Sequence, residues 1–148
     1  MFKHLLVPID GSELSQVALK QACSFAREAG ARLTVYHAIP PYLPYGMATE
    51  GAFDLAGASE VYRAAMDKRA ESILNSAKLA ASEAGLEAEV IGTEYEDPYE
   101  GIIATAQSCG CDLIFMASHG RRGASALILG SVTQKVLTHC RIPVLVYR

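Results

Sequence analysis

The sequence lacks several features that mark familiar classes of protein. It contains no run of about 20 apolar residues, the length that a membrane-spanning helix needs, and its first residues lack the layout of a signal peptide. The formal net charge is −3 and no basic stripe stands out, which makes nucleic acid a poor candidate partner. We therefore expect a cytoplasmic protein without a membrane segment and without a nucleic-acid partner.

Cysteine pairs with the spacing of redox or metal motifs are also absent. The four cysteines are Cys23, Cys109, Cys111 and Cys140, and none of them forms a CxxC pair. Cys109 and Cys111 flank one glycine at a predicted helix-to-strand junction, where a disulfide would be strained. We therefore expect reduced thiols in a cytosolic core.

Two common phosphate-binding signatures are missing as well. Only one glycine, Gly11, follows the first apolar run, where a dinucleotide-binding fold would carry GxGxxG. The motif GxxxxGKS/T occurs nowhere in the chain, which excludes a P-loop protein.

What is present is an alternation of strand-like and helix-like segments over 148 residues, a length that fits one domain. Apolar runs cover residues 4–9, 33–39, 88–92, 112–117 and 143–147, and helical patterns cover about 12–30, 59–84, a stretch from 97, and 131–140. Such alternation implies crossover connections and a parallel sheet. The inner runs are apolar throughout, as expected for strands covered on both faces. We therefore predict one doubly wound α/β domain over residues 1–148.

Two helix starts carry a capping signature. Asp97, followed by Pro98 and then Glu100, resembles a capping box at the third helix. Ser131 and Gln134 have the same spacing at the fourth helix. For Ser131 a capping role and a phosphate contact are compatible, and both stay open.

The candidate chemistry lies beyond the carboxyl ends of the strands, because ligands of parallel sheets bind there, at the point where the strand order reverses. The loop from Ala117 to Ser131 contains Gly120, Gly123 and Gly130, and glycines let backbone N–H groups approach phosphate oxygens closely. Gly130 also leads into a helix, whose N-terminal N–H groups favour anions.

Several neighbouring residues have both a functional and a plainer interpretation. Arg121 and Arg122 add positive charge to the loop, or are solvated surface charges. Asp10 lies at the predicted crevice, or only forms a turn before the first helix. His119 has no visible base or nucleophile as a partner. Pro8 lies in a predicted central strand, where proline cannot donate a backbone hydrogen bond to a neighbouring strand. We therefore expect the ladder of backbone hydrogen bonds to be interrupted there.

The same loop resembles the universal stress protein family. ATP-binding members of that family carry Gly, two residues, Gly, nine residues, and then Gly-Ser or Gly-Thr. Here Gly120 is followed by nine residues and then by Gly130-Ser131. The opening LLVPIDGS and the closing PVLV match as well, so the resemblance covers the whole chain. Ala117 departs from the pattern, because it stands at the motif's first glycine.

The resemblance implies a five-stranded parallel sheet in the order 3-2-1-4-5, with helices on both faces. It also implies a bound adenine nucleotide (ATP, or AMP or ADP) with Mg or Mn held through the phosphates. Asp10 would lie near the ribose and the metal, and the backbone of Ala38 would contact adenine. The candidate nucleotide-binding residues are therefore Asp10, Ala38, Ala117, Gly120, Arg121, Arg122, Gly123, Gly130, Ser131 and Val132, with Asp10 as the candidate metal ligand and no catalytic residue.

The function that follows is a nucleotide-binding regulatory or stress-response protein without efficient catalysis. The alternatives are a slow ATPase or autokinase, and a nucleotide-free dimeric scaffold. In the implied order the strand over residues 143–147 is an edge and apolar, and such an edge invites pairing. We therefore expect a homodimer through this strand, with closed two-fold symmetry. A regulatory partner protein is left open.

Overall fold

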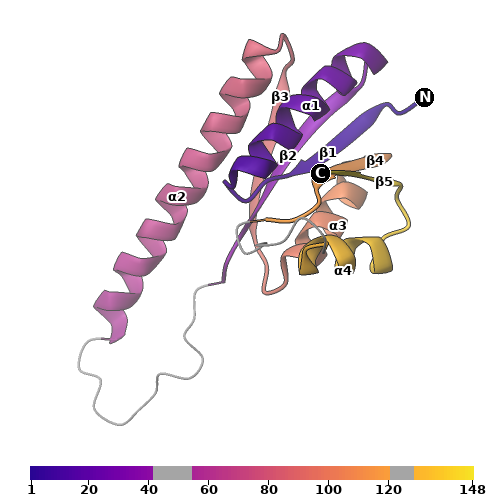
Figure 1. Ribbon diagram of the computed structural model, residues 1–148. Helices are drawn as coiled ribbons and strands as arrows, with labels where there is room; N and C mark the ends of the chain where they lie inside the picture. The colour runs from indigo at the N-terminus through magenta and orange to yellow at the C-terminus, as the bar shows by residue number, and fades with distance from the viewer. Residues whose placement is uncertain (42–54, 121–128) are drawn as a thin grey trace.

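The computed structural model describes residues 1–41, 55–120 and 129–148, and the backbone alone of residues 55–59 (Figure 1). Within these residues five strands alternate with four helices. Their order is β1 (His4–Pro8), α1 (Glu13–Ala29), β2 (Arg32–Ile39), α2 (Leu55–Glu83), β3 (Ala88–Glu94), α3 (Pro98–Ser108), β4 (Leu113–Ala117), α4 (Ser131–His139) and β5 (Val144–Tyr147).

The strands form one parallel sheet in the order β3-β2-β1-β4-β5. This confirms the predicted doubly wound architecture and the strand order 3-2-1-4-5. The chain runs outward from β1 to β3 and then returns to the other side of β1 at β4. The order therefore reverses between β1 and β4.

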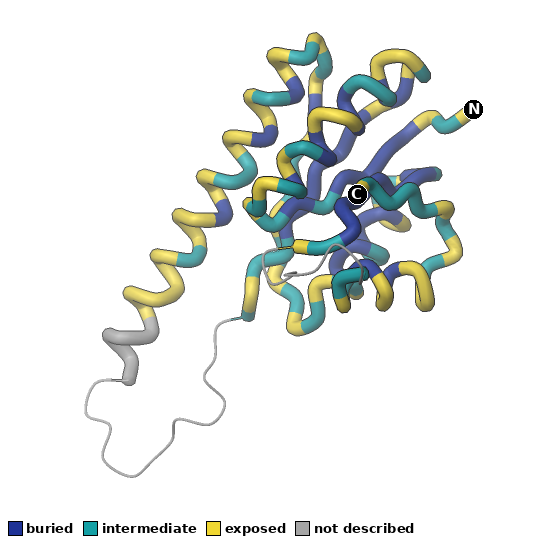
Figure 2. The backbone as a smooth tube through the Cα atoms, in the orientation of Figure 1, coloured by how far each residue is buried: buried dark blue, intermediate teal, exposed yellow. Residues whose placement is uncertain are grey.

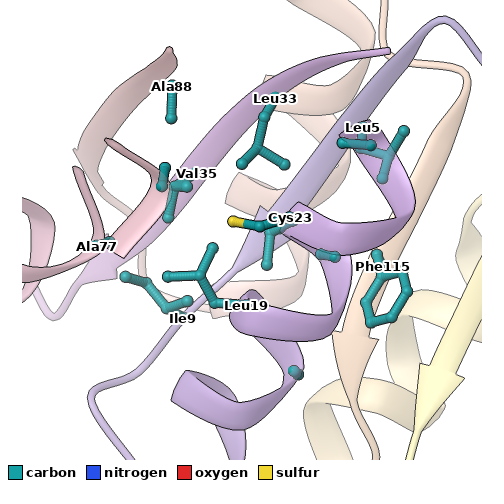
Figure 3. Close-up of a cluster of buried hydrophobic side chains, with 14 of the residues drawn as sticks. Leu5, Ile9, Leu19, Cys23, Leu33, Val35, Ala77, Ala88 and Phe115 are labelled. Atoms are coloured by element: carbon teal, nitrogen blue, oxygen red, sulfur yellow. The ribbon is translucent and has the colours of Figure 1, made fainter. Parts of the chain in front are cut away.

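Each face of the sheet is covered by one pair of helices (Figure 1). Successive strand residues point to opposite faces, so Leu5 and Val7 join the core beneath α1 and α2, whereas Leu6 joins the core beneath α3 and α4. Figure 3 shows Leu19 and Cys23 of α1 among the side chains of the first core. Burial on both faces explains why the inner strands are apolar throughout.

Tyr36 of β2 is fully buried in the second core and fixes how closely α3 packs. Its hydroxyl lies 2.9 Å from the Thr93 Oγ1 atom, and burial raises the pKa of Tyr36. A Cβ atom on Gly101 would overlap that hydroxyl. Only glycine therefore allows the first turn of α3 to lie over this ring.

Both ends of α1 are capped, at the limits of the predicted helical pattern over residues 12–30, but the two predicted capping boxes do not form. The Ser12 Oγ atom accepts a hydrogen bond from the Ser15 N–H at 3.2 Å, and Gly30 ends α1 with φ +62°. Asp97 precedes α3 without a side-chain cap from the described residues, and its Oδ1 atom accepts a hydrogen bond from Lys135 Nζ at 2.9 Å. The N-cap residue of α4 is Gly130, so the capping role for Ser131 is wrong.

Helix α2 begins at Leu55, earlier than the predicted start at residue 59. In the sequence, small and apolar residues recur at regular helical spacing only from Met66 onward. Residues 60–65 are exposed to solvent. Because they pack on no core, they need not be apolar at every third or fourth position. Figure 2 shows this exposed stretch in yellow, extending past the rest of the molecule.

All four cysteines are free, as predicted. Cys23 and Cys111 are buried, and Cys109 and Cys140 are half-buried. Burial, together with the nearby Cys109, raises the pKa of Cys111 to about 12, so its thiol stays protonated. In the part of the chain that the structure describes, no helix combines the length and apolarity that crossing a membrane requires.

The ladder between β1 and β4 ends early, as the position of Pro8 predicts. Pairing extends only from Leu5 to Leu6, whereas β1 pairs with β2 along its whole length. Backbone groups of successive strand residues point to alternate sides. The Ile9 N–H bonds to the Tyr36 carbonyl of β2 at 2.8 Å, so the nitrogen of Pro8 faces β4 and offers no donor.

The opposite end of the sheet holds a polar row that begins at His4. The His4 side chain is 4% exposed, and its Nε2 atom lies 2.8 Å from Thr34 Oγ1, which donates to Glu89 Oε2 at 3.3 Å. The Nδ1 atom is buried and has no hydrogen-bond partner among the described residues.

Burial, followed by the positive charge of Arg32, lowers the pKa of His4, against opposing effects from the Cys109 backbone, Glu89 and Asp112. A lowered pKa means that the unfolded chain binds the proton more tightly than the folded one. The stability that neutral His4 contributes is therefore present above pH 6.5 and is lost as the pH falls below it.

We predict that His4→Gln flattens the dependence of the unfolding free energy on pH between 7.5 and 5. Glutamine retains a donor for Thr34 and does not titrate. One proton changes the slope by at most about 1.4 kcal/mol per pH unit. Urea unfolding at several pH values measures both slopes, and equal slopes for the two proteins would show that His4 does not titrate differently on folding.

Candidate functional site

A cleft of about 890 Å³ lies at the carboxyl ends of the central strands, beside the opening between β1 and β4. Its volume is within the range of small-molecule sites. The strand ends and the start of α4 contribute Pro8, Ile9, Asp10, Tyr36, His37, Ala38, Met116, Ala117, His119, Gly120, Gly130, Ser131, Val132 and Thr133.

The predicted site residues that the structure describes all line this cleft. They are Asp10, Ala38, Ala117, Gly120, Gly130, Ser131 and Val132. Arg121, Arg122 and Gly123 lie outside the described residues. The fold thus brings together residues from β1, β2, β4 and α4 that are more than 100 positions apart in the sequence.

Asp10 combines the two roles that the sequence left open. Its Oδ1 atom accepts a hydrogen bond from the Ser12 N–H at 2.9 Å, which forms the turn into α1. Its Oδ2 atom lies against Gly120, where an added Cβ would overlap the oxygen. Glycine at position 120 therefore lets the segment after β4 approach the carboxylate that follows β1.

Gly130 is required for a close approach rather than for an unusual backbone angle. Its φ is −61° and its ψ is 150°, which other residues also adopt. A Cβ atom there would lie 3.0 Å from the Cα atom of His119 and 3.4 Å from the Ser118 carbonyl oxygen. The Gly130 N–H donates to that carbonyl at 2.8 Å. The two ends of the loop are therefore in direct backbone contact.

Ala117 ends β4 with an ordinary extended backbone and pairs with Tyr147 of β5. Its carbonyl accepts a hydrogen bond from the buried Thr133 Oγ1 atom at 3.1 Å. This bond fixes the first turn of α4 onto the end of β4. The departure from glycine at position 117 thus leaves the local geometry intact.

The start of α4 is the described part of the cleft best suited to an anion. The first turn holds no acidic residue, and no side chain caps it among the described residues. Unpaired N–H groups and the helix dipole favour negative charge at such an end. Gln134 instead donates from its side chain to the Leu129 carbonyl at 2.9 Å, which ties the helix to the loop before it.

Three groups stand out among the cleft residues that escaped the sequence prediction, which also include residues 95–99 before and at the start of α3. His37 is buried beside Ala38, with its Nδ1 atom 2.8 Å from the Ile9 carbonyl oxygen. Lys135 lies one turn after Ser131, forms an ion pair with Asp97 at 2.9 Å, and has its pKa raised chiefly by that carboxylate. The third group, from α2, is Tyr62, Met66 and Arg69.

The sequence contained a signal for two of these groups. His37 directly precedes Ala38, and helical spacing places Lys135 on the same face of α4 as Ser131. Nothing in the sequence indicated that α2 reaches the cleft, because that depends on how far the helix extends past the sheet.

A metal ion would have few protein ligands here. Among the residues described, no group of three or more His, Cys, Asp or Glu side chains could hold a metal. Mg²⁺ commonly uses one or two carboxylates together with substrate phosphates. Asp10 fits that arrangement as a single carboxylate beside the loop, so the donor set suits a metal that arrives with a phosphorylated ligand.

Comparisons with known proteins agree with this fold. The sequence model of the universal stress protein family matches residues 1–148. Universal stress protein YxiE of Bacillus subtilis is 34% identical over 152 residues, with 100% of both chains covered. The structure of MJ0577 from Methanocaldococcus jannaschii has a TM-score of 0.79 at 26% identity, covering 99% of this chain and 95% of that one.

A further universal stress protein, solved in complex with cAMP, has a TM-score of 0.73 at 22% identity and covers 99% of this chain and 97% of its own. Both structures share the architecture described above. Together with the full-length sequence match, they give a single conclusion. The chain belongs to the universal stress protein family.

Proposed function

We propose that this protein is a single cytoplasmic domain that binds ATP or a close adenine nucleotide, with Mg or Mn, and acts as a regulatory or stress-response protein without efficient catalysis. One observation carries the proposal. The Asp10 carboxylate, Gly120 and the uncapped start of α4 lie in one cleft.

The arrangement supports one orientation of the nucleotide. The phosphates would lie at Gly130, Ser131 and Val132, where backbone donors and the helix dipole favour anions. The adenine would lie toward Ala38 at the end of β2, and Asp10 between them would meet the ribose or a phosphate-bound metal. The related protein in complex with cAMP supports an adenine nucleotide as the class of ligand.

We predict Mg-dependent ATP binding that Gly130→Val weakens at least tenfold. The valine Cβ would crowd the His119 backbone at 3.0 Å and push the start of α4 away from the loop. Calorimetry with and without EDTA measures binding, and native mass spectrometry identifies any nucleotide that co-purifies. No heat from ATP, and no displacement of a fluorescent ATP analogue, would contradict the proposed function.

Ser131→Ala is the matched control for stability in that experiment. Ser131 is exposed and provides no cap, so its loss should leave the unfolding temperature unchanged. A fall in ATP affinity for Ser131→Ala then reports a lost ligand contact. Thermal unfolding of Gly130→Val shows how much of its effect comes from a weakened fold.

We predict that Ala117→Gly changes ATP affinity less than threefold, because the extended backbone at this position suits alanine. Calorimetry on both proteins is sufficient. A gain of tenfold or more, with the wild type binding barely at all, would show that alanine has degraded the site and would favour the nucleotide-free scaffold.

We further propose a homodimer formed by antiparallel pairing of β5. The carbonyls of Pro143 and Tyr147 accept hydrogen bonds from β4 at 2.9 and 2.7 Å, so the backbone groups of Val144 and Val146 point away from the sheet. An apolar edge strand with outward backbone groups is a template for pairing with a second chain. A second copy would satisfy it with closed two-fold symmetry.

We predict that Val146→Pro yields monomers by light scattering, and that Val144→Lys together with Val146→Lys yields monomers or insoluble protein, since Val144 packs against the second core. Proline removes an N–H group that faces outward, so the pairing of β5 with β4 is left in place. The control is Leu137→Lys, which changes an exposed apolar residue of α4 and should not alter the mass. An unchanged dimer in the β5 variants would refute this interface.

A further inference from the structure

The N-terminal half of α2 reaches past the sheet and flanks the cleft. Ile73 marks the level at which the helix leaves the sheet, because a Cβ atom on Gly11 would lie 3.0 Å from its Cδ1 atom. A helix rises about 1.5 Å per residue, so Tyr62 lies roughly 16 Å further out. We call residues 60–72 the α2 overhang.

One face of the α2 overhang is directed at the cleft. Tyr62, Met66 and Arg69 line it, and their spacing of four and then three residues puts them on one side of the helix. Continuing the same face inward leads to Ile73, which packs against the core, and to the buried Ala77. The face that packs on the sheet thus continues beyond it as a wall of the cleft.

The strand order decides which part of a nucleotide would meet this wall. Helix α2 packs on β2 and β3, on one side of β1. The anion-binding start of α4 follows β4, on the other side of β1. A nucleotide with its phosphates at α4 therefore extends its base toward Ala38 at the end of β2, and so toward the α2 overhang.

The residues of the wall suit the face of a flat ring. Arginine stacks on aromatic rings through its planar guanidinium group, methionine contacts them through its polarizable sulfur, and tyrosine stacks through its own ring.

Among the described cleft residues, Arg69 and Lys135 are the two with a Lys or Arg side chain, and Lys135 forms an ion pair with Asp97. Arg69 has no ion pair among the described residues.

We infer that Arg69, with Met66 and Tyr62, packs against the base of the bound nucleotide and so makes α2 the third wall of the binding site. This inference rests on the proposed function, and it adds a contact from a helix that lies outside the loop motif. The contact favours a large aromatic base and does not depend on the number of phosphates.

The test compares Arg69→Ala with Arg63→Ala by calorimetry with Mg-ATP, Mg-ADP and AMP. Both arginines are exposed on α2, but Arg63 does not line the cleft, so the two variants lose the same charge and gain the same helix propensity. A stacking contact of this kind is worth roughly tenfold in affinity. We expect Arg69→Ala to weaken all three nucleotides by the same factor and Arg63→Ala to weaken none.

A loss that shrinks as phosphates are removed would place Arg69 at the phosphates and overturn the inference. Unchanged affinities for Arg69→Ala, or equal losses for both variants, would overturn it as well, while ATP binding by the wild type would leave the proposed function standing. Failure of the wild type to bind any of the three nucleotides would overturn both.

Discussion

The opening between β1 and β4 is the constraint on which the rest of the structure depends. The two strands pair only at Leu5 and Leu6, and the proline nitrogen at position 8 cannot extend the ladder. Beyond that point the chain can turn from β1 into α1, and from β4 into the glycine loop, without competition for the same backbone groups. Asp10 and Gly120 meet at this opening.

The fold was predictable because each element carried its own signal. The apolar runs marked strands covered on both faces, and the helical pattern over residues 12–30 marked α1. The predicted cap at Asp97 does not form, and its carboxylate pairs instead with Lys135, 38 positions away. Local spacing contains no information about that pair.

Some residues of the candidate site could be predicted from the sequence, and others could not. Asp10 was named as a candidate because it follows a strand, and parallel strands end at one edge of the sheet, whereas Ala38, near the end of β2, was implied by the family resemblance. Tyr62 and Arg69 were missed because their place in the cleft depends on the length and direction of a helix, and no local pattern specifies either. The tight contacts at Gly101 and Gly120 were also hidden, since a glycine's sequence position does not reveal which atoms lie where its side chain would be.

The residues of the loop motif also have a structural role, besides the proposed contact with phosphate. Gly130 fits closely against the His119 backbone, so it holds the start of α4 beside the end of β4. The buried Thr133 hydroxyl reinforces this by bonding to the Ala117 carbonyl. Gly130, a residue of the motif, therefore also fixes how the start of α4 is joined to the end of β4.

That joint continues into the edge strand. The Tyr147 carbonyl of β5 accepts from the Ser118 N–H, and the Ser118 carbonyl accepts from the Gly130 N–H, so two consecutive hydrogen bonds of 2.7 and 2.8 Å connect the sheet edge to the start of α4. Tyr147 and Gly130 cannot move far apart unless one of these two hydrogen bonds breaks. If a ligand at the start of α4 and a second chain at β5 each displace this joint, thermodynamic reciprocity requires the same coupling free energy in both directions.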